Sequence, residues 1–183
     1  YFNDFHTKNP YRRGMLKEEI INVLNTDTVF NDNILKYLEI DNLIKCVDNN
    51  WSRSDFKILL SKHEISLVNT ITDIIKKSNF NPPSIKELIN SINEKEQVVK
   101  KIIDISINNN NLILINGSLL FSKKNIDEMI DLISIFFKKN TLLDIKTFKS
   151  LTNTSRKYAV PLLEYLDKIG ITYRSENGRK YKK

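Results

Sequence analysis

Two adjacent cations, Arg156 and Lys157, follow Ser155 at the start of a predicted helix. Cations in the first turn of a helix oppose its dipole and cost about 0.3–1 kcal/mol each when exposed, so another requirement is expected to place them there. The free amide groups of a helix start attract phosphate, and two cations beside them strengthen such a site. The pattern favours phosphate binding. A solvated charge pair in a lysine-rich protein is an equally open alternative.

A predicted hairpin follows this helix. Its turn is expected at Asn177-Gly178, a dipeptide that is typical of two-residue hairpin turns. That turn would place Glu176 opposite Arg179. It would also place Arg174 opposite Tyr181, on the same face of the hairpin.

The cations of the hairpin extend the candidate site. Arg174 and Arg179 are expected to reach the same ligand as Arg156, and Lys180 is a further candidate. Tyr181 is expected either to stack on an unpaired base or, as is more common for a hairpin aromatic, to pack against its neighbours.

The net charge of the chain, +7, lies entirely in its last fifth. Residues 145–183 carry ten basic and three acidic side chains, and the preceding residues sum to zero. A neutral body with one basic end directs its field toward a polyanion, so nucleic acid is the expected partner. The basic residues are Lys146, Lys149, Arg156, Lys157, Lys168, Arg174, Arg179, Lys180, Lys182 and Lys183.

The elements that position these residues follow one plan, repeated three times: helices and then a hairpin. Predicted helices are Met15–Leu24, Asn33–Ile40, Glu64–Lys77, the segment after Pro82-Pro83-Ser84, Val98–Ile107, Ile126–Phe137, Thr147–Leu151 and 156–169. Predicted hairpins are 43–56, 112–121 with its turn at Asn116-Gly117, and 171–181. This plan predicts a mostly helical α+β protein of tandem winged-helix domains. The predicted domains are 1–61, 62–122 and 123–183.

An enzyme is not favoured by the residues available. His6 and His63 are the only side chains that ordinarily act as bases near neutral pH, and neither lies in a nucleophile or metal-ligand motif. The single cysteine, Cys46, excludes an internal disulfide and is expected to be a packed thiol. We therefore expect no catalytic residue and no metal ligand in this chain.

A DNA-binding winged-helix regulator is the main alternative. Its third helix would enter the major groove and carry base-reading side chains over two exposed turns. Here the later exposed positions hold Val160, Glu164 and Asp167, and the two acids would repel phosphates. Only the helix start and the hairpin suit a polyanion, which favours a compact RNA loop over a long groove.

The segment from Leu151 to Arg179, LTNTSRKYAVPLLEYLDKIGITYRSENGR, resembles the last winged helix of the bacterial selenocysteine-specific elongation factor, the SelB type. The matching features are the Ser-Arg-Lys-Tyr-Ala start, the Leu-Glu-Tyr-Leu-Asp core, Gly170 and the Thr172-x-Arg174 strand. Phe5-His6, Asn9-Pro10, Gly14-Met15 and Pro82-Pro83-Ser84 resemble earlier winged helices of the family.

The resemblance implies recognition of the mRNA hairpin (SECIS) that marks a UGA codon for selenocysteine insertion. Carried over by position, Ser155 lies at the binding helix start, Arg156 and Lys157 hold phosphates, and Tyr158 supports or contacts them. Arg174, Arg179 and Lys180 approach from the wing.

The family also joins these domains to a GTPase that delivers selenocysteinyl-tRNA to the ribosome. The chain opens at Tyr1 rather than Met, so we expect a piece of a longer protein. Its four glycines cannot form a phosphate loop, so no cofactor is expected for this part. The resemblance implies GTP and magnesium for the GTPase part. No signal peptide or membrane span is visible, and a cytoplasmic monomer is expected.

Overall fold

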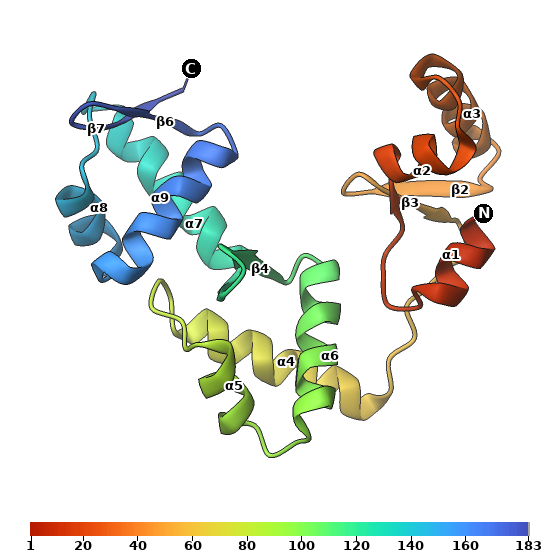
Figure 1. Ribbon diagram of the computed structural model, residues 1–183, viewed down its shortest axis with the longest axis horizontal. Coiled ribbons are helices and arrows are strands. Elements are labelled where there is room, and N and C mark those ends of the chain that lie inside the picture. The colour runs from red at the N-terminus through yellow and green to blue at the C-terminus, as the bar shows by residue number, and fades with distance from the viewer. Residues whose placement is uncertain (183) are drawn as a thin grey trace. The chain divides into compact units, whose positions relative to one another are not determined.

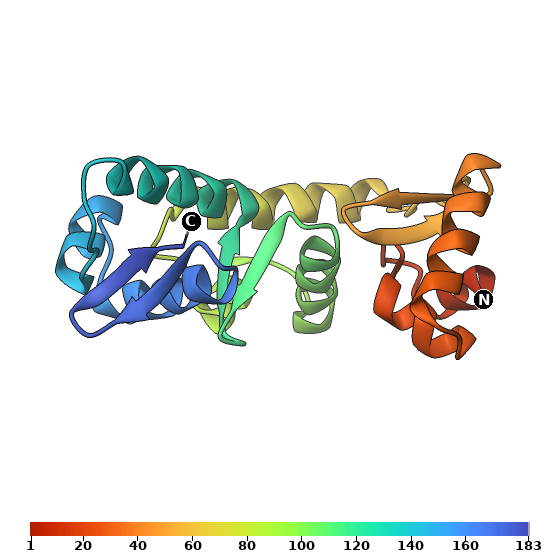
Figure 2. The same ribbon diagram turned by 90° about the horizontal axis from the view of Figure 1, so that it is seen from above.

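The computed structural model describes residues 1–182 and divides the chain into two compact units, Tyr1–Glu64 and Ile65–Lys183. Figures 1 and 2 show helices joined to small antiparallel hairpins in both units. The mostly helical α+β fold predicted from the sequence is confirmed. The second and third predicted domains lie in one unit, and the division into three domains stays a prediction.

The first unit packs three helices on a small sheet around Met15, Ile20, Leu35 and Ile44. The sheet has the order β1-β3-β2 and is antiparallel throughout. The elements are α1 (Phe2–Lys8), β1 (Met15–Leu16), α2 (Lys17–Leu24), α3 (Thr28–Ile40), β2 (Ile44–Val47) and β3 (Asn50–Arg53).

The helix predicted from Met15 begins two residues later, at Lys17. Met15 pairs instead with Trp51 of β3, and the Leu16 amide donates to the Glu19 carboxylate at 2.8 Å, which starts α2. Gly14 permits this pairing, because a Cβ there would lie 2.3 Å from the Trp51 carbonyl oxygen.

Helix α4 (Lys62–Lys77) starts just before the second unit and continues into it. It is followed by α5 (Ile85–Ser91), α6 (Glu96–Asn108), β4 (Leu112–Ile115) and β5 (Leu119–Ser122). Ser84 caps α5 as predicted, and Glu87 completes a capping box. The hairpin turn spans three residues rather than two, since Ile115 pairs with Leu119.

The last segment contains α7 (Lys123–Phe137), α8 (Ile145–Thr152), α9 (Arg156–Lys168), β6 (Thr172–Ser175) and β7 (Gly178–Tyr181). We call residues 172–181 the wing. The predicted order of three helices and a hairpin is confirmed. Pro161 lies inside α9, which continues past it to Lys168.

One hydrophobic core joins the second hairpin to the last segment. Ile115, Leu119 and Phe121 of that hairpin are buried together with residues of α7, α8 and α9, among them Phe148 and Leu162. Ser122 ends β5 and also caps α7 by accepting from the Asn125 amide. No spacer therefore separates the second hairpin from the last segment.

The wing is extended by a short bridge from the segment before α8. The backbone groups of Leu143 and Arg179 exchange two hydrogen bonds, each 2.9 Å long. Gly178 makes room for this bridge, because a Cβ at this position would lie 2.6 Å from the Leu143 carbonyl oxygen.

The change Gly178→Ala is therefore expected to lower the free energy of unfolding by about 1–3 kcal/mol, because the backbone at Leu143 must shift. Urea unfolding followed by far-UV circular dichroism measures this. Asn177→Ala, at the exposed neighbouring turn position, is the control. Equal stability of both variants would contradict the role of this close approach.

Candidate nucleic-acid interface

The start of α9 offers free amide groups beside two cations. Ser155 is the N-cap residue, but its side chain makes no capping hydrogen bond. Ser84, Ser122 and Asp144, in contrast, cap α5, α7 and α8 with their side chains. Ser155, Arg156 and Lys157 are exposed. The helix start can therefore accept an anionic group from solvent.

Hydrogen bonds hold this helix start against the segment before α5. The Thr154 hydroxyl oxygen lies 2.8 Å from the Phe80 carbonyl oxygen and 2.9 Å from Asn81 Oδ1. The Asn81 amide group donates back to the Asn153 carbonyl at 3.0 Å. The position of α9 is thus fixed by a neighbouring helical layer.

Tyr158 takes part in the same attachment. Its hydroxyl donates to the Pro82 carbonyl at 3.0 Å, and its half-buried ring packs on the core. The Lys157 ammonium lies 5.0 Å from the centre of that ring, in cation–π geometry. Tyr158 therefore lies where it can support the cations of the helix start.

The turn of the wing lies one residue earlier than predicted, so each strand residue pairs with a partner two positions from the predicted one. Arg174 pairs with Arg179 and Ser175 with Gly178, so the turn is Glu176-Asn177. The bridge to Leu143 requires Gly178 inside the strand, and this requirement overrides the Asn-Gly turn signal.

Arg179 is not the surface cation that the sequence predicts. Its side chain is 8% exposed, and its Nε donates to Asp167 Oδ2 at 3.2 Å. The Thr172 hydroxyl donates to the other oxygen of the same carboxylate at 2.6 Å. A buried guanidinium needs such a partner. Arg179 therefore holds the wing to α9 instead of facing solvent.

Arg174 is exposed and lies at an open pocket between the wing tip and the start of α8. The pocket has a volume of about 370 Å³ and is also lined by Lys146, Asp144 and Glu176. Asp144 is occupied as the cap of α8, because its carboxylate accepts from the Thr147 amide at 2.7 Å. Arg174 and Lys146 are therefore the pocket cations that can meet a phosphate.

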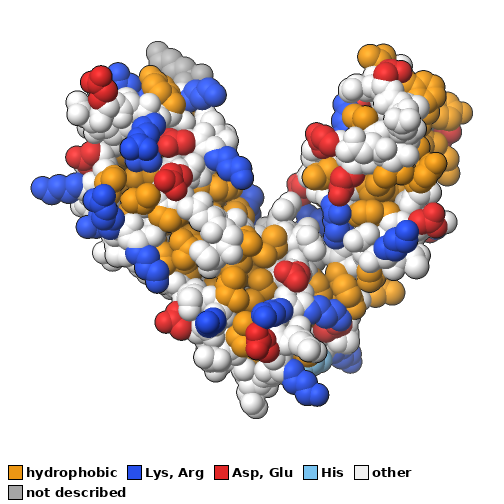
Figure 3. All heavy atoms as spheres, in the orientation of Figure 1, with side chains coloured by type: hydrophobic (Ala, Val, Ile, Leu, Met, Phe, Trp, Pro, Cys, Tyr) orange, Lys and Arg blue, Asp and Glu red, His pale blue; other side chains and the backbone are white. Residues whose placement is uncertain are grey.

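An exposed face of α8 extends from this pocket toward the start of α9. Lys146, Lys149 and Asn153 are exposed, and their spacing of three and four residues places them on one face. Lys and Arg side chains gather over α8 and α9 in Figure 3. Lys146 and Lys149 were absent from the predicted site, although their helical spacing could have indicated them.

Two further wing residues lie apart from this surface. Lys180 is exposed and pairs with Tyr173, on the opposite face of the wing from Arg174. Tyr181 packs on Phe137, with ring centres 5.4 Å apart. The structure thus brings Ser155, Arg156 and Lys157 together at the helix start, whereas Arg174 and Lys180 occupy different faces of the wing.

The later face of α9 is partly covered. Val160 is half-buried, and α9 packs on β4. Asn116, in the second hairpin turn, donates to the Glu164 carboxylate at 3.3 Å. A helix covered in this way does not present two open turns to a DNA groove.

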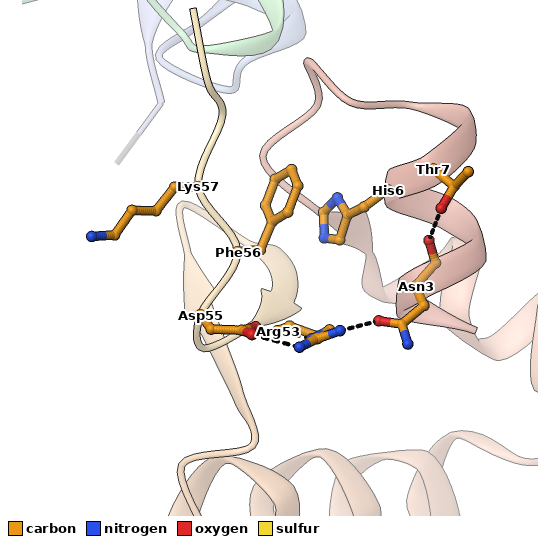
Figure 4. A pocket seen from close by; sticks show the side chains of 7 residues that line it. All are labelled: Asn3, His6, Thr7, Arg53, Asp55, Phe56 and Lys57. Atoms are coloured by element: carbon orange, nitrogen blue, oxygen red, sulfur yellow. Dashed lines mark hydrogen bonds and ion pairs between the residues drawn. The ribbon is translucent and has the colours of Figure 1, made fainter.

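The first unit contains a separate pocket of about 480 Å³, shown in Figure 4. His6 is 7% exposed and stacks on Phe56 with ring centres 3.4 Å apart. The Arg53 guanidinium bonds to Asp55 and Asn3 at its rim. Within the described residues, neither His6 nitrogen has a hydrogen-bond partner. Burial, followed by the nearby Arg53 charge, lowers the pKa of His6.

Other groups considered as reactive occupy ordinary positions. Burial raises the pKa of the Cys46 thiol, which disfavours the thiolate. His63 is exposed at the start of α4. Among the described residues, no helix has the length and apolar character needed to cross a bilayer.

Two family models, both described as elongation factor SelB, winged helix, match the chain. The model of the third such domain covers residues 135–181, and that of the second covers residues 1–51. The chain is also 25% identical, over 191 residues, to the selenocysteine-specific elongation factor of Desulfomicrobium baculatum. That alignment covers 100% of the chain and 29% of the relative, so the chain spans less than a third of that protein.

Two solved structures share the fold. One is a bacterial selenocysteine-specific elongation factor, EF-Sec, with a TM-score of 0.54, 24% identity, and coverage of 98% of this chain and 28% of that one. The other is the mRNA-binding domain of E. coli SelB in complex with SECIS RNA, with a TM-score of 0.57 and 18% identity. The alignment covers 68% of this chain and 100% of the E. coli domain. These two structures confirm the winged-helix fold. The SelB family models confirm the predicted resemblance.

Replacing Arg179 by Ala is expected to lower the free energy of unfolding by about 1.5–3 kcal/mol, because Asp167 loses its charged partner. The same change at exposed Arg174 is expected to alter stability by less than about 0.5 kcal/mol. Urea unfolding followed by circular dichroism compares the two. Unchanged stability of the Arg179 variant would show that the pair with Asp167 does not hold the wing.

The first unit is expected to lose stability as the pH falls below about 6.5. The folded state disfavours protonated His6, whereas the unfolded chain binds a proton there with an ordinary histidine pKa. Fluorescence of Trp51, the single tryptophan, reports urea unfolding of this unit at pH 7.5 and pH 5.5. His6→Phe should reduce the loss, and His63→Gln should leave it unchanged. An equal loss in the His6 variant would assign the effect to other groups.

Proposed function

We propose that this chain, which carries winged-helix domains of the elongation factor SelB type, is the mRNA-binding part of a selenocysteine-specific translation elongation factor. Its ligand is the messenger hairpin, the SECIS element, that marks a UGA codon for selenocysteine insertion. The support is the SelB match over residues 135–181 together with the cationic helix start inside that range. The E. coli SelB domain that shares this fold was solved in complex with SECIS RNA.

The observation that carries the proposal is the uncapped start of α9. Its amide groups, Arg156 and Lys157 converge at a helix end that Thr154 and Tyr158 hold in place. Such a rigid anionic-ligand site suits the closely spaced phosphates of a hairpin loop. Because little rearrangement is needed on binding, most of the charge-assisted bonding contributes to affinity.

The exposed cations of α8 and the wing tip extend this site along the RNA backbone. Lys149 and Lys146 lead from the helix start toward Arg174. Phosphate contacts dominate affinity and position the nucleic acid, while base contacts supply specificity. We therefore assign phosphate binding to these side chains.

The rest of the protein is proposed to be a GTPase that binds GTP and magnesium and delivers selenocysteinyl-tRNA to the ribosome. The D. baculatum relative, of which this chain matches 29%, is a selenocysteine-specific elongation factor. In this proposal the chain acts as a monomer in the cytoplasm and performs no catalysis itself. The charge-balanced first unit serves as a structural arm.

The change Arg156→Ala is expected to weaken hairpin binding by about 1.5–3 kcal/mol, the range for a charged hydrogen bond. Gel-shift titration of the full chain with the hairpin beside a selenoprotein UGA codon measures this, with a scrambled hairpin and duplex DNA as competitors. Lys36→Ala, an exposed change on α3, is the matched control. If about four phosphates are held, the log–log salt slope is expected near roughly −3. Equal effects at Arg156 and Lys36, or equal affinity for duplex DNA, would contradict the proposal.

A further inference from the structure

The outer face of the wing carries an exposed aromatic beside cations. Tyr173 is 48% exposed and pairs across the strands with exposed Lys180. The inner face is closed, because Thr172 and Arg179 are buried and both bond to Asp167. The wing thus presents one face that is packed except at exposed Arg174, and one open face.

Tyr173 has no structural role that explains its position. Among the described residues, no hydrogen bond or ring contact involves its side chain, and it does not belong to the core around α9. Tyr181, the other aromatic of the wing, is occupied by packing on Phe137. In the corresponding hairpin of the second repeat, every residue of the β5 strand is buried, and the exposed side chain of β4, Leu114, is aliphatic.

The charged side chains of the open face are all cations. Besides Tyr173 and Lys180 it holds Ser175 and the exposed Lys182, whose amide donates to the Ile171 carbonyl and continues the pairing. Strand alternation puts Arg174 on the other face, and the single acid of the wing, Glu176, lies in the turn. A flat ring flanked by ammonium groups fits a nucleotide, because the base stacks on the ring while the phosphate meets the cations.

We propose that Tyr173 is a stacking platform for an unpaired base of the bound RNA hairpin and that Lys180 holds the adjoining phosphate. This inference rests on the proposed function, but its residues lie on a different surface from the phosphate site at the start of α9. It adds a base contact at Tyr173 of the wing to the backbone contacts assigned to the helix start and to the exposed cations.

The test uses the full chain and the hairpin beside a selenoprotein UGA codon, with 2-aminopurine at one loop position at a time. Tyr173→Ala is expected to raise Kd about 5- to 150-fold, the range for one base–aromatic stack, and to abolish fluorescence quenching at one loop position. Tyr173→Phe keeps the ring and is expected to retain both. Tyr37→Ala, which removes an exposed tyrosine of α3, is the matched control.

Circular dichroism verifies that each variant is folded, and Tyr173→Leu provides a second apolar variant without an aromatic ring. If Tyr173→Ala binds and quenches like the original chain while Arg156→Ala binds weakly, the stacking inference fails and the proposed function stands. If neither change weakens binding, both fail. If Tyr173→Phe loses as much affinity as Tyr173→Ala, the contact belongs to the hydroxyl and stacking is refuted.

Discussion

The attachment of the α9 start to residues 80–82 is the constraint on which the rest of the interface depends. Thr154 and Tyr158 reach two backbone carbonyls of that segment, at 2.8 and 3.0 Å. Hydrogen bonds to backbone carbonyls fix position without adding charge, so the cations on the exposed side stay available to a ligand. The same helix start thus has one side tied to protein and another open to solvent.

The cations of the wing differ in burial. Arg179 is held inward by Asp167, and this pair also fixes Thr172, so the sheet is oriented on α9 before any ligand arrives. Removing a charge from water is costly without a partner, which explains why one of the two acids of α9 is used here. Arg174 and Lys180, free of such pairing, remain on the surface.

Sequence reasoning found the helices, the order of elements and the cationic helix start, because hydrophobic periodicity and charge placement are local signals. It missed the wing register, since the bridge between Leu143 and Arg179 joins residues 36 positions apart. It also assigned Arg179 to the surface, because nothing in the local pattern shows that Asp167 turns toward it. Lys146 and Lys149 contribute to the predicted basic charge but not to the predicted site, because the helix predicted at Thr147–Leu151 begins after Lys146, whereas α8 begins at Ile145.

The core shared by the second hairpin and the last segment determines the smallest piece of the chain that can stand alone. A chain shortened to residues 123–183 would lose Ile115, Leu119 and Phe121 from around Phe148 and Leu162. It would also lose Ser122, the cap of α7, and the carbonyls to which Thr154 and Tyr158 bond. Such a truncated domain would expose its own interior to water, whereas residues 65–183 keep these partners together. The smallest part of the chain that keeps this core complete is therefore the whole second unit and not its last segment.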